Sequence, residues 1–243
     1  SGCGCPDPVR FAVTERKTAL HIFARQPAHG KVDIPFSREA PMRSLYTTLL
    51  FVPVFVLAVS VHEYAHAWLA VRRGDPTPRW EGRLTLDVRA HLSFVGTIML
   101  LLFGIGWAKP VRVNPRNLQN PKTDMFWIAL AGPVSNLGLA ACFALLYHAG
   151  GPLLPWNTAG RFAADLLYVG VYLNVLLFYF NLLPVPPLDG SKILARFVPA
   201  RWNYAMLVLE QYGVLVLFLL LLLLDLGNLL GTLTRLTLRI FGL

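Results

Sequence analysis

The sequence contains few charged residues. Only 14% of its 243 residues are Asp, Glu, Lys or Arg, whereas 55% are hydrophobic. A soluble domain carries about 25% charged residues, because its surface has to interact with water. The deficit excludes a soluble globule of this size and indicates that much of the apolar surface faces lipid.

Acidic residues and cysteines are scarce as well. The chain has 13 Asp and Glu against 22 Lys and Arg, which gives a net charge of +9. On so apolar a chain, this excess does not require a nucleic-acid partner, because cytoplasmic loops of membrane proteins collect Lys and Arg. Two of the three cysteines lie within the first five residues, so neither a disulfide framework nor a CxxC metal site is available. We expect a lipid bilayer and no nucleic acid as a partner.

The first 41 residues differ in composition from the rest of the chain. They are polar, contain five prolines and show no amphipathic period. Met42 follows them, and an apolar run begins soon after it. We expect residues 1–41 to be a disordered or non-native extension, with a regulatory arm as the alternative. We expect residues 42–243 to form an integral membrane domain.

Five apolar stretches follow Met42. They comprise residues 45–71, 92–107, 125–149, 162–183 and 206–230. Four of them are long enough to cross a hydrocarbon core at about 1.5 Å per residue. The stretch 92–107 is shorter and contains three glycines. Beyond the last stretch, arginines alternate with leucines, which is typical of an interfacial amphipathic helix.

The distribution of basic residues predicts an orientation. Lys and Arg gather in the loops 72–91, 107–124 and 184–205. If residues 92–107 crossed the membrane, the first two of these loops would lie on opposite sides. We therefore expect 92–107 to enter the bilayer and return, so that all three basic loops face the cytoplasm. The predicted fold is an all-α polytopic membrane protein with about four transmembrane helices and one re-entrant or short helix.

Two short segments have the alternating pattern of strands. Residues 82–87 and 111–113 alternate between apolar and polar or charged side chains. We expect them to form short membrane-associated β-strands.

The first apolar stretch contains an HExxH motif, His62-Glu63-Tyr64-Ala65-His66. On a helix, residues four apart are rotated by about 40°, so both imidazoles project from one face. Two such nitrogens suit one Zn²⁺, and Glu63 is placed to take a proton from a metal-bound water as general base. The alternative to metal binding is that these polar side chains are hydrogen-bonded to neighbouring helices. Metal binding accounts for three costly polar residues in a membrane helix at once.

A hydrolytic zinc site needs a third protein ligand. The candidates are several acids and two histidines, namely Asp75, Glu81, Asp87, His91, His148, Asp165, Asp189 and Asp225. Asp75, Glu81 and Asp87 lie in a basic loop, where we expect them to be solvated. Asp189 stands apart, because it follows three prolines that break the helix after an apolar stretch. Such broken backbone occurs at membrane depth only beside protein or water, although a turn in an ordinary loop is the alternative.

The motifs together resemble those of the site-2 protease family of intramembrane zinc metalloproteases, peptidase family M50. HEYAH (62–66) and NLLPVPPLDG (181–190) resemble the paired motifs of that family. Further likenesses are GRLTLD (82–87), WAKPVRVNP (107–115) and GPVSN (132–136), typical of the compact prokaryotic branch without a PDZ domain. The resemblance covers roughly residues 45–215.

The resemblance implies a role for individual residues. His62, His66 and Asp189 would bind one zinc ion per chain, and Glu63 would activate water and later protonate the leaving amine. Asn181 and Asn136 would contact the substrate backbone or the developing oxyanion, unless they serve only helix packing. His91 also lies where the family commonly has a histidine. The residues that follow it here differ from the family pattern, so the resemblance gives His91 no defined role.

The implied activity is hydrolysis of peptide bonds within or near transmembrane segments of membrane-protein substrates. The active site would lie towards the cytoplasmic side of a cell membrane, and a strand edge would clamp the unwound substrate. Two alternatives are an ion or proton transporter and a non-catalytic membrane scaffold. The intact Glu63 between the two histidines weighs against both.

Overall fold

The computed structural model describes residues 45–103, 106–155 and 157–243. The predicted N-terminal extension, residues 1–41, lies outside the described residues. The described helices are α2 (Leu45–Arg72), α3 (Thr77–Trp80), α4 (Val88–His91), α5 (Phe94–Phe103), α6 (Pro121–Gly150), α7 (Thr158–Asn181), α8 (Asp189–Ala195), α9 (Asn203–Leu223) and α10 (Leu226–Ile240). Short 3-10 turns occupy Pro115–Asn117, Gly151–Leu153 and Ala200–Trp202.

Four of the described helical segments are long and apolar enough to cross a membrane. They are Leu45–Arg72, Pro121–Leu153, Thr158–Asn181 and Tyr204–Leu223. They lie at the four long apolar stretches of the sequence, because a run of about 20 apolar residues can satisfy its backbone in lipid only as a helix.

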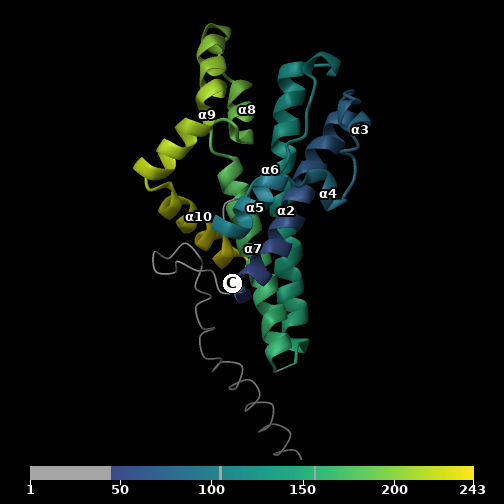
Figure 1. The fold of residues 1–243 in the computed structure, drawn as a ribbon, viewed down its shortest axis with the longest axis vertical. Coiled ribbons are helices and arrows are strands. Elements are labelled where there is room, and N and C mark those ends of the chain that lie inside the picture. The colour runs from purple at the N-terminus through teal and green to yellow at the C-terminus, as the bar shows by residue number, and fades with distance from the viewer. Residues whose placement is uncertain (1–44, 104–105, 156) are drawn as a thin grey trace, which may run out of the picture. The chain divides into compact units, whose positions relative to one another are not determined.

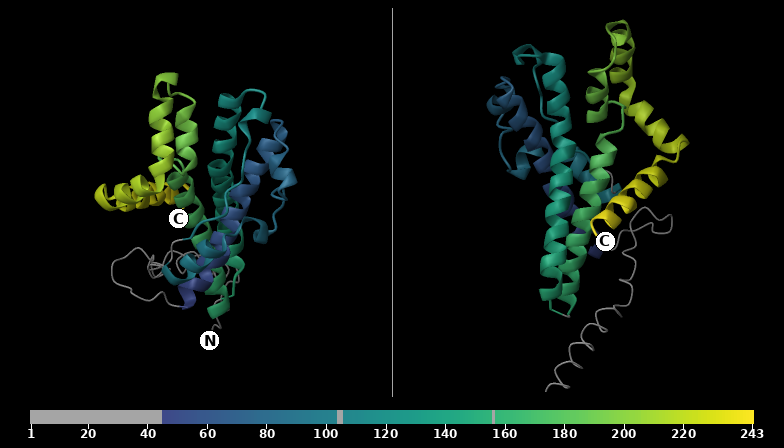
Figure 2. Two further views of the ribbon diagram at one scale, coloured as in Figure 1. Left: turned by 45° about the horizontal axis from the view of Figure 1, so that its top comes forward. Right: turned by 180° about the vertical axis from the view of Figure 1, so that it is seen from behind.

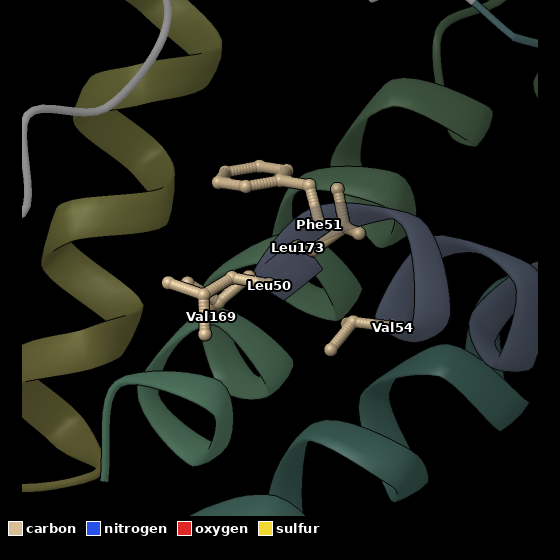
Figure 3. Close-up of a cluster of buried hydrophobic side chains, with 5 residues drawn as sticks. All are labelled: Leu50, Phe51, Val54, Val169 and Leu173. Carbon is tan, nitrogen blue, oxygen red and sulfur yellow. The ribbon is translucent and has the colours of Figure 1, made fainter. Parts of the chain in front are cut away.

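The helices α2, α6 and α7 pack together and form the centre of the described unit. Figure 1 shows them side by side, with α9 and α10 beyond α7 and with α3 and α4 on the side of α2. A second view agrees with this arrangement (Figure 2). Leu50, Phe51 and Val54 of α2 pack against Val169 and Leu173 of α7 in one buried cluster (Figure 3). This packing fixes α2, which carries the HExxH motif.

Small residues bring α6 close to its neighbours. Ala140 and Ala144 of α6 are buried. At Gly170 of α7, a Cβ atom would lie 2.5 Å from the ring of Phe143, so only glycine fits against α6 there. Small residues of this kind are the usual means of close helix packing in membranes.

The expected β-strands at residues 82–87 and 111–113 are wrong. No strand forms in the described parts of the chain, and the pairing outside helices is one isolated bridge between Leu92 and Ala108. Residues 82–87 instead turn at Gly82, which has φ +67°, and end where Asp87 caps α4 by accepting a hydrogen bond from the Arg89 N–H. The guanidinium of Arg83 is buried and donates to the Ala90 carbonyl. The alternating apolar and polar residues at 82–87 therefore belong to a turn held by local hydrogen bonds and not to a paired strand.

The helix α5 is too short to cross a membrane. Its ten residues span about 15 Å, half of a hydrocarbon core. The residues on either side of it meet, since Leu92 pairs with Ala108 and the Lys109 N–H donates to the His91 carbonyl at 2.7 Å. The chain therefore leaves this segment next to the point where it entered.

Candidate metal centre

The two histidines of the HExxH motif lie on one face of α2. His62 and His66 are both buried, with 7% of each residue exposed. Their Nε2 atoms are 3.0 Å apart, and the rings are nearly perpendicular. The i, i+4 spacing thus brings two nitrogen donors to one point inside a helix of transmembrane length.

Asp189 brings a carboxylate to the same point from the far end of α7. That helix ends at Asn181, and Pro184, Pro186 and Pro187 follow before α8 begins at Asp189. Asp189 Oδ2 lies 3.0 Å from His62 Nε2 and 3.1 Å from His66 Nε2. The proline segment therefore returns the chain to α2 after the helix has ended.

Gly190 permits this return because it has no side chain, and there is no space for one. A Cβ atom there would lie 2.5 Å from the carbonyl carbon of Leu182 and would also collide with the carbonyl oxygens of Leu182 and Leu183. The start of α8 is thus pressed against the backbone that ends α7. A side chain at this position would push Asp189 away from the histidines.

Among the described residues, His62, His66 and Asp189 form a cluster that could hold a metal ion, with one ligand atom of each within 4.8 Å of the others. The other sequence candidates do not join it within the part of the chain that the structure describes. Two imidazole nitrogens and one carboxylate oxygen are a donor set of catalytic zinc sites, which keep a further position for water. The donor chemistry and its convergence therefore fit a zinc ion.

Neighbouring helices fix the orientation of both imidazoles. His62 Nδ1 lies 2.6 Å from Asn136 Oδ1, and His66 Nδ1 lies 2.6 Å from the carbonyl of Ile128. Because carbonyl oxygens only accept, both Nδ1 atoms carry the proton and donate. Each Nε2 then presents a lone pair to the cluster, as a metal ligand requires.

Asn136 belongs to a buried chain of hydrogen bonds that also includes Asn174, a residue that the sequence motifs do not mark. Its Nδ2 donates to Asn174 Oδ1 at 3.0 Å and to the Ala58 carbonyl at 3.3 Å. Asn174 Nδ2 donates in turn to the Gly170 carbonyl at 2.8 Å. Both asparagines are fully buried. An amide in the middle of the apolar stretch 162–183 was the sequence signal for Asn174.

Gly132 gives α6 its close approach to the cluster. A Cβ atom at this position would lie 2.6 Å from His62 Cε1 and 2.5 Å from His66 Cε1. The GPVSN segment thus supplies both the space for the rings and, four residues later, the partner of His62.

Glu63 points to a different wall of the site. Its Oε2 accepts a hydrogen bond from the backbone N–H of Val111 at 2.9 Å. Val111 lies in the non-helical segment between α5 and the 3-10 turn at Pro115–Asn117, so this segment holds the carboxylate beside the histidine pair.

A cavity of about 270 Å³ opens onto the cluster. Besides the three residues of the cluster and Glu63, it is lined by apolar residues and by two polar ones, namely Pro110, Val111, Val113, Met125, Ile128, Ala129, Pro187, Asn181 and Lys192. Asn181 thus lines the cavity, while its Nδ2 donates to the Leu177 carbonyl at 3.0 Å. Asn136 lies behind His62.

Asp75 supports the segment that carries Val111. Its place in a basic loop predicts a solvated side chain, but Asp75 is fully buried. It accepts hydrogen bonds from Thr77 Oγ1 at 2.6 Å, the Asn114 N–H at 2.7 Å and Asn117 Nδ2 at 2.8 Å. Burial by itself raises the pKa of Asp75, but the hydrogen bonds together lower it by more, so the net pKa lies below the usual value.

The comparisons with known proteins bear on this site. Residues 149–224 match the model of "Peptidase family M50". Three relatives carry names that describe them as putative zinc metalloproteases. They are YwhC of Bacillus subtilis (40% identical, 76% of this chain and 87% of the relative), Rip2 of Mycolicibacterium smegmatis (27%, 88% and 83%) and MJ0611 of Methanocaldococcus jannaschii (34%, 51% and 61%). No solved structure matches the chain.

The chain belongs to peptidase family M50. The resemblance of its sequence motifs to that family is thereby confirmed. Membership of a peptidase family makes it an enzyme, and the four apolar helices among its described residues make it an integral membrane protein. Within this M50 peptidase, the cluster of His62, His66 and Asp189 with Glu63 beside it is the candidate active site.

Proposed function

We propose that this M50 peptidase is a zinc-dependent intramembrane endopeptidase that cleaves membrane proteins within or near their transmembrane segments. One observation carries the proposal. Two Nε2 atoms of α2, a helix of transmembrane length, and one carboxylate oxygen of Asp189 at the start of α8 converge on one point. Three relatives named as zinc metalloproteases support the choice of metal.

His62, His66 and Asp189 would hold one zinc ion per chain. Bound zinc supplies a Lewis acid that polarises the scissile carbonyl and lowers the pKa of water. The residues behind the ligands keep their Nε2 atoms pointing inward, because the Asn136 Oδ1 and the Ile128 carbonyl accept hydrogen bonds from the two Nδ1–H groups.

Glu63 acts as the general base. The Val111 N–H holds Oε2, and we assign Oε1 to the proton taken from the attacking water. The same carboxyl group then gives that proton to the amine of the leaving peptide. Holding one oxygen fixes the orientation of the other, so the proton acceptor needs little reorganisation during the reaction.

The cavity wall suits an apolar substrate segment. Val111, Met125 and Ile128 supply apolar surface, and Asn181 supplies an amide at the same wall. A helical substrate must unwind locally, since its peptide groups are bonded within the helix. Asn181 would then hydrogen-bond the exposed substrate backbone. We expect the cavity to face the cytoplasmic side, because we expect the basic loops to lie there.

A transporter or an inactive scaffold is not favoured. Both would tolerate intramembrane histidines, but neither requires a carboxylate held beside them by a backbone N–H. The zinc-metalloprotease names of the relatives point to catalysis.

The proposal is tested with purified protein in detergent and a transmembrane-segment substrate. Glu63→Gln should keep one zinc ion per chain and lose cleavage. Glu210→Gln is the matched control, because Glu210 is an exposed residue of the apolar helix α9 away from the cavity. It should cleave like the wild type. Cleavage by Glu63→Gln, or zinc binding that survives removal of both histidines, would refute the proposal.

A further inference from the structure

The two oxygens of the Asp189 carboxylate face different partners. Oδ2 lies 3.0 and 3.1 Å from the histidine Nε2 atoms. Oδ1 lies 3.6 Å from the Nζ of Lys192, three residues later on α8. One carboxylate therefore has a metal-binding side and a side that is ion-paired with a lysine.

This division matters for a hydrolytic site. A carboxylate can bind a metal ion through one oxygen or through both. A catalytic zinc site has three protein ligands and leaves a position for water. If Asp189 used both oxygens, the second one would compete for that position.

We propose that Lys192 is a positioning residue that holds Asp189 Oδ1 away from the cluster, so that Asp189 offers Oδ2 alone. The inference rests on the proposed function and concerns the same site. The ammonium neutralises the second oxygen and turns it towards the cavity wall that Lys192 lines. Residues that orient a metal ligand in this way are as much a part of a metal site as the ligands.

The local structure makes this placement stable. The side chain of Asp189 is 8% exposed, so the charge of Oδ1 has little contact with water, while Lys192 is 45% exposed and keeps its ammonium partly solvated. Ser191 between them donates from Oγ to the Leu188 carbonyl at 2.7 Å, which fixes the first turn of α8. The pair at i, i+3 then faces one side of that turn.

The test uses Co²⁺ in place of zinc, because the visible absorption of Co²⁺ is stronger with four ligands than with five or six. The variant is Lys192→Met, which keeps an unbranched side chain of similar length up to the Cε atom and removes the charge. We expect a weaker visible band at unchanged metal stoichiometry, and a kcat about tenfold lower with an unchanged KM. Lys192→Arg keeps the charge and should restore both the band and kcat.

Arg196→Met is the matched control. Arg196 follows α8, is exposed and does not line the cavity, so its loss should change neither readout. Lys192→Gln replaces the Met variant if that one does not fold, with the same expected changes. An unchanged band and kcat in the neutral Lys192 variants would overturn the proposal, as would equal effects in Arg196→Met. Failure of the proposed function looks different, because the wild type would bind no Co²⁺ or Glu63→Gln would still cleave.

Discussion

The Nδ1 of His62 lies 2.6 Å from the Oδ1 of Asn136, a fully buried residue of the neighbouring helix α6. The contact sets which ring nitrogen carries the proton, and it leaves Nε2 free to face Asp189. The sequence left a substrate contact and helix packing open for Asn136, and in the structure its side chain is engaged with a proposed ligand of the metal.

Replacing Asn136 should therefore weaken metal binding. In Asn136→Leu the imidazole of His62 loses the acceptor for its Nδ1 proton. We expect the zinc affinity to fall by about 10–100-fold, measured by competition with a chromophoric chelator. Asn136→Asp keeps an acceptor oxygen and should retain most of the affinity. Equal affinities in the Leu variant and the wild type would show that the contact does not orient His62.

Gly132→Ala should disturb the same rings by volume alone. A Cβ atom there would lie within 2.6 Å of a carbon atom of each imidazole, so the rings or α6 must move. We expect at least about a tenfold loss of zinc affinity and a matching loss of cleavage. Gly138→Ala on the same helix meets nothing within 4 Å and serves as the control. A Gly132→Ala protein with full zinc content and activity would contradict the packing described here.

Part of this architecture could be predicted from hydropathy. The long apolar runs correspond to helices, because backbone buried in lipid must bond within its own segment. The predicted C-terminal end of the last transmembrane helix was less accurate. The sequence gives an apolar run over 206–230, but α9 ends at Leu223, and Asp225 takes a left-handed turn with φ 47° before α10 starts. Hydropathy cannot reveal such a break, because leucines continue on both sides.

The strand prediction failed for a different reason. Alternation at residues 82–87 measures which side chains are apolar, not where the backbone bonds go. There, the Arg83 N–H donates to the Pro78 carbonyl, and the buried guanidinium bonds to the Ala90 carbonyl. The hydrogen-bond partner of Val111 is likewise a side chain, Glu63, from a helix 48 residues earlier. Such long-range partners depend on how helices pack, which a single sequence does not reveal.

The bond from the Val111 N–H to Glu63 can be removed without changing any catalytic side chain. Val111→Pro deletes the donor, so the carboxylate loses the contact that orients it. We expect kcat to fall by about a hundredfold while zinc content is unchanged. Val111→Ala keeps the N–H and should retain near-normal kcat. If both variants lose activity equally, the side chain of Val111 and not its N–H is what matters.

Asn181 should act on substrate binding and not on the metal. It lines the cavity without contacting a proposed ligand in the described hydrogen bonds. In Asn181→Ala we expect KM to rise by about tenfold, the loss of about 1.4 kcal/mol typical of one hydrogen bond. The zinc affinity should equal that of the wild type. A loss of zinc with an unchanged KM would place Asn181 in the metal site instead.

The buried carboxylate of Asp75 makes stability depend on pH in a defined direction. Its folded pKa lies below that of the unfolded chain, so the charged form stabilises the fold above the unfolded value of about 3.9 and this contribution fades as pH falls. Asp75→Asn removes the charge but keeps a similar size. We expect it to unfold more easily at pH 7, by about 1–3 kcal/mol for the weakened bonds from Asn114 and Asn117.

The gap between the wild type and Asp75→Asn should narrow when unfolding in detergent is repeated at pH 4 and below, since the wild-type carboxylate then takes up a proton on unfolding. Asp87→Asn is the control, because Asp87 is exposed. It caps α4 by accepting a hydrogen bond from the Arg89 N–H, and the amide oxygen of Asn can accept the same bond. Its difference from the wild type should be small at both pH values. A gap for Asp75→Asn that stays constant from pH 7 to pH 3 would mean that its hydrogen bonds do not depend on the negative charge, contrary to the lowered pKa.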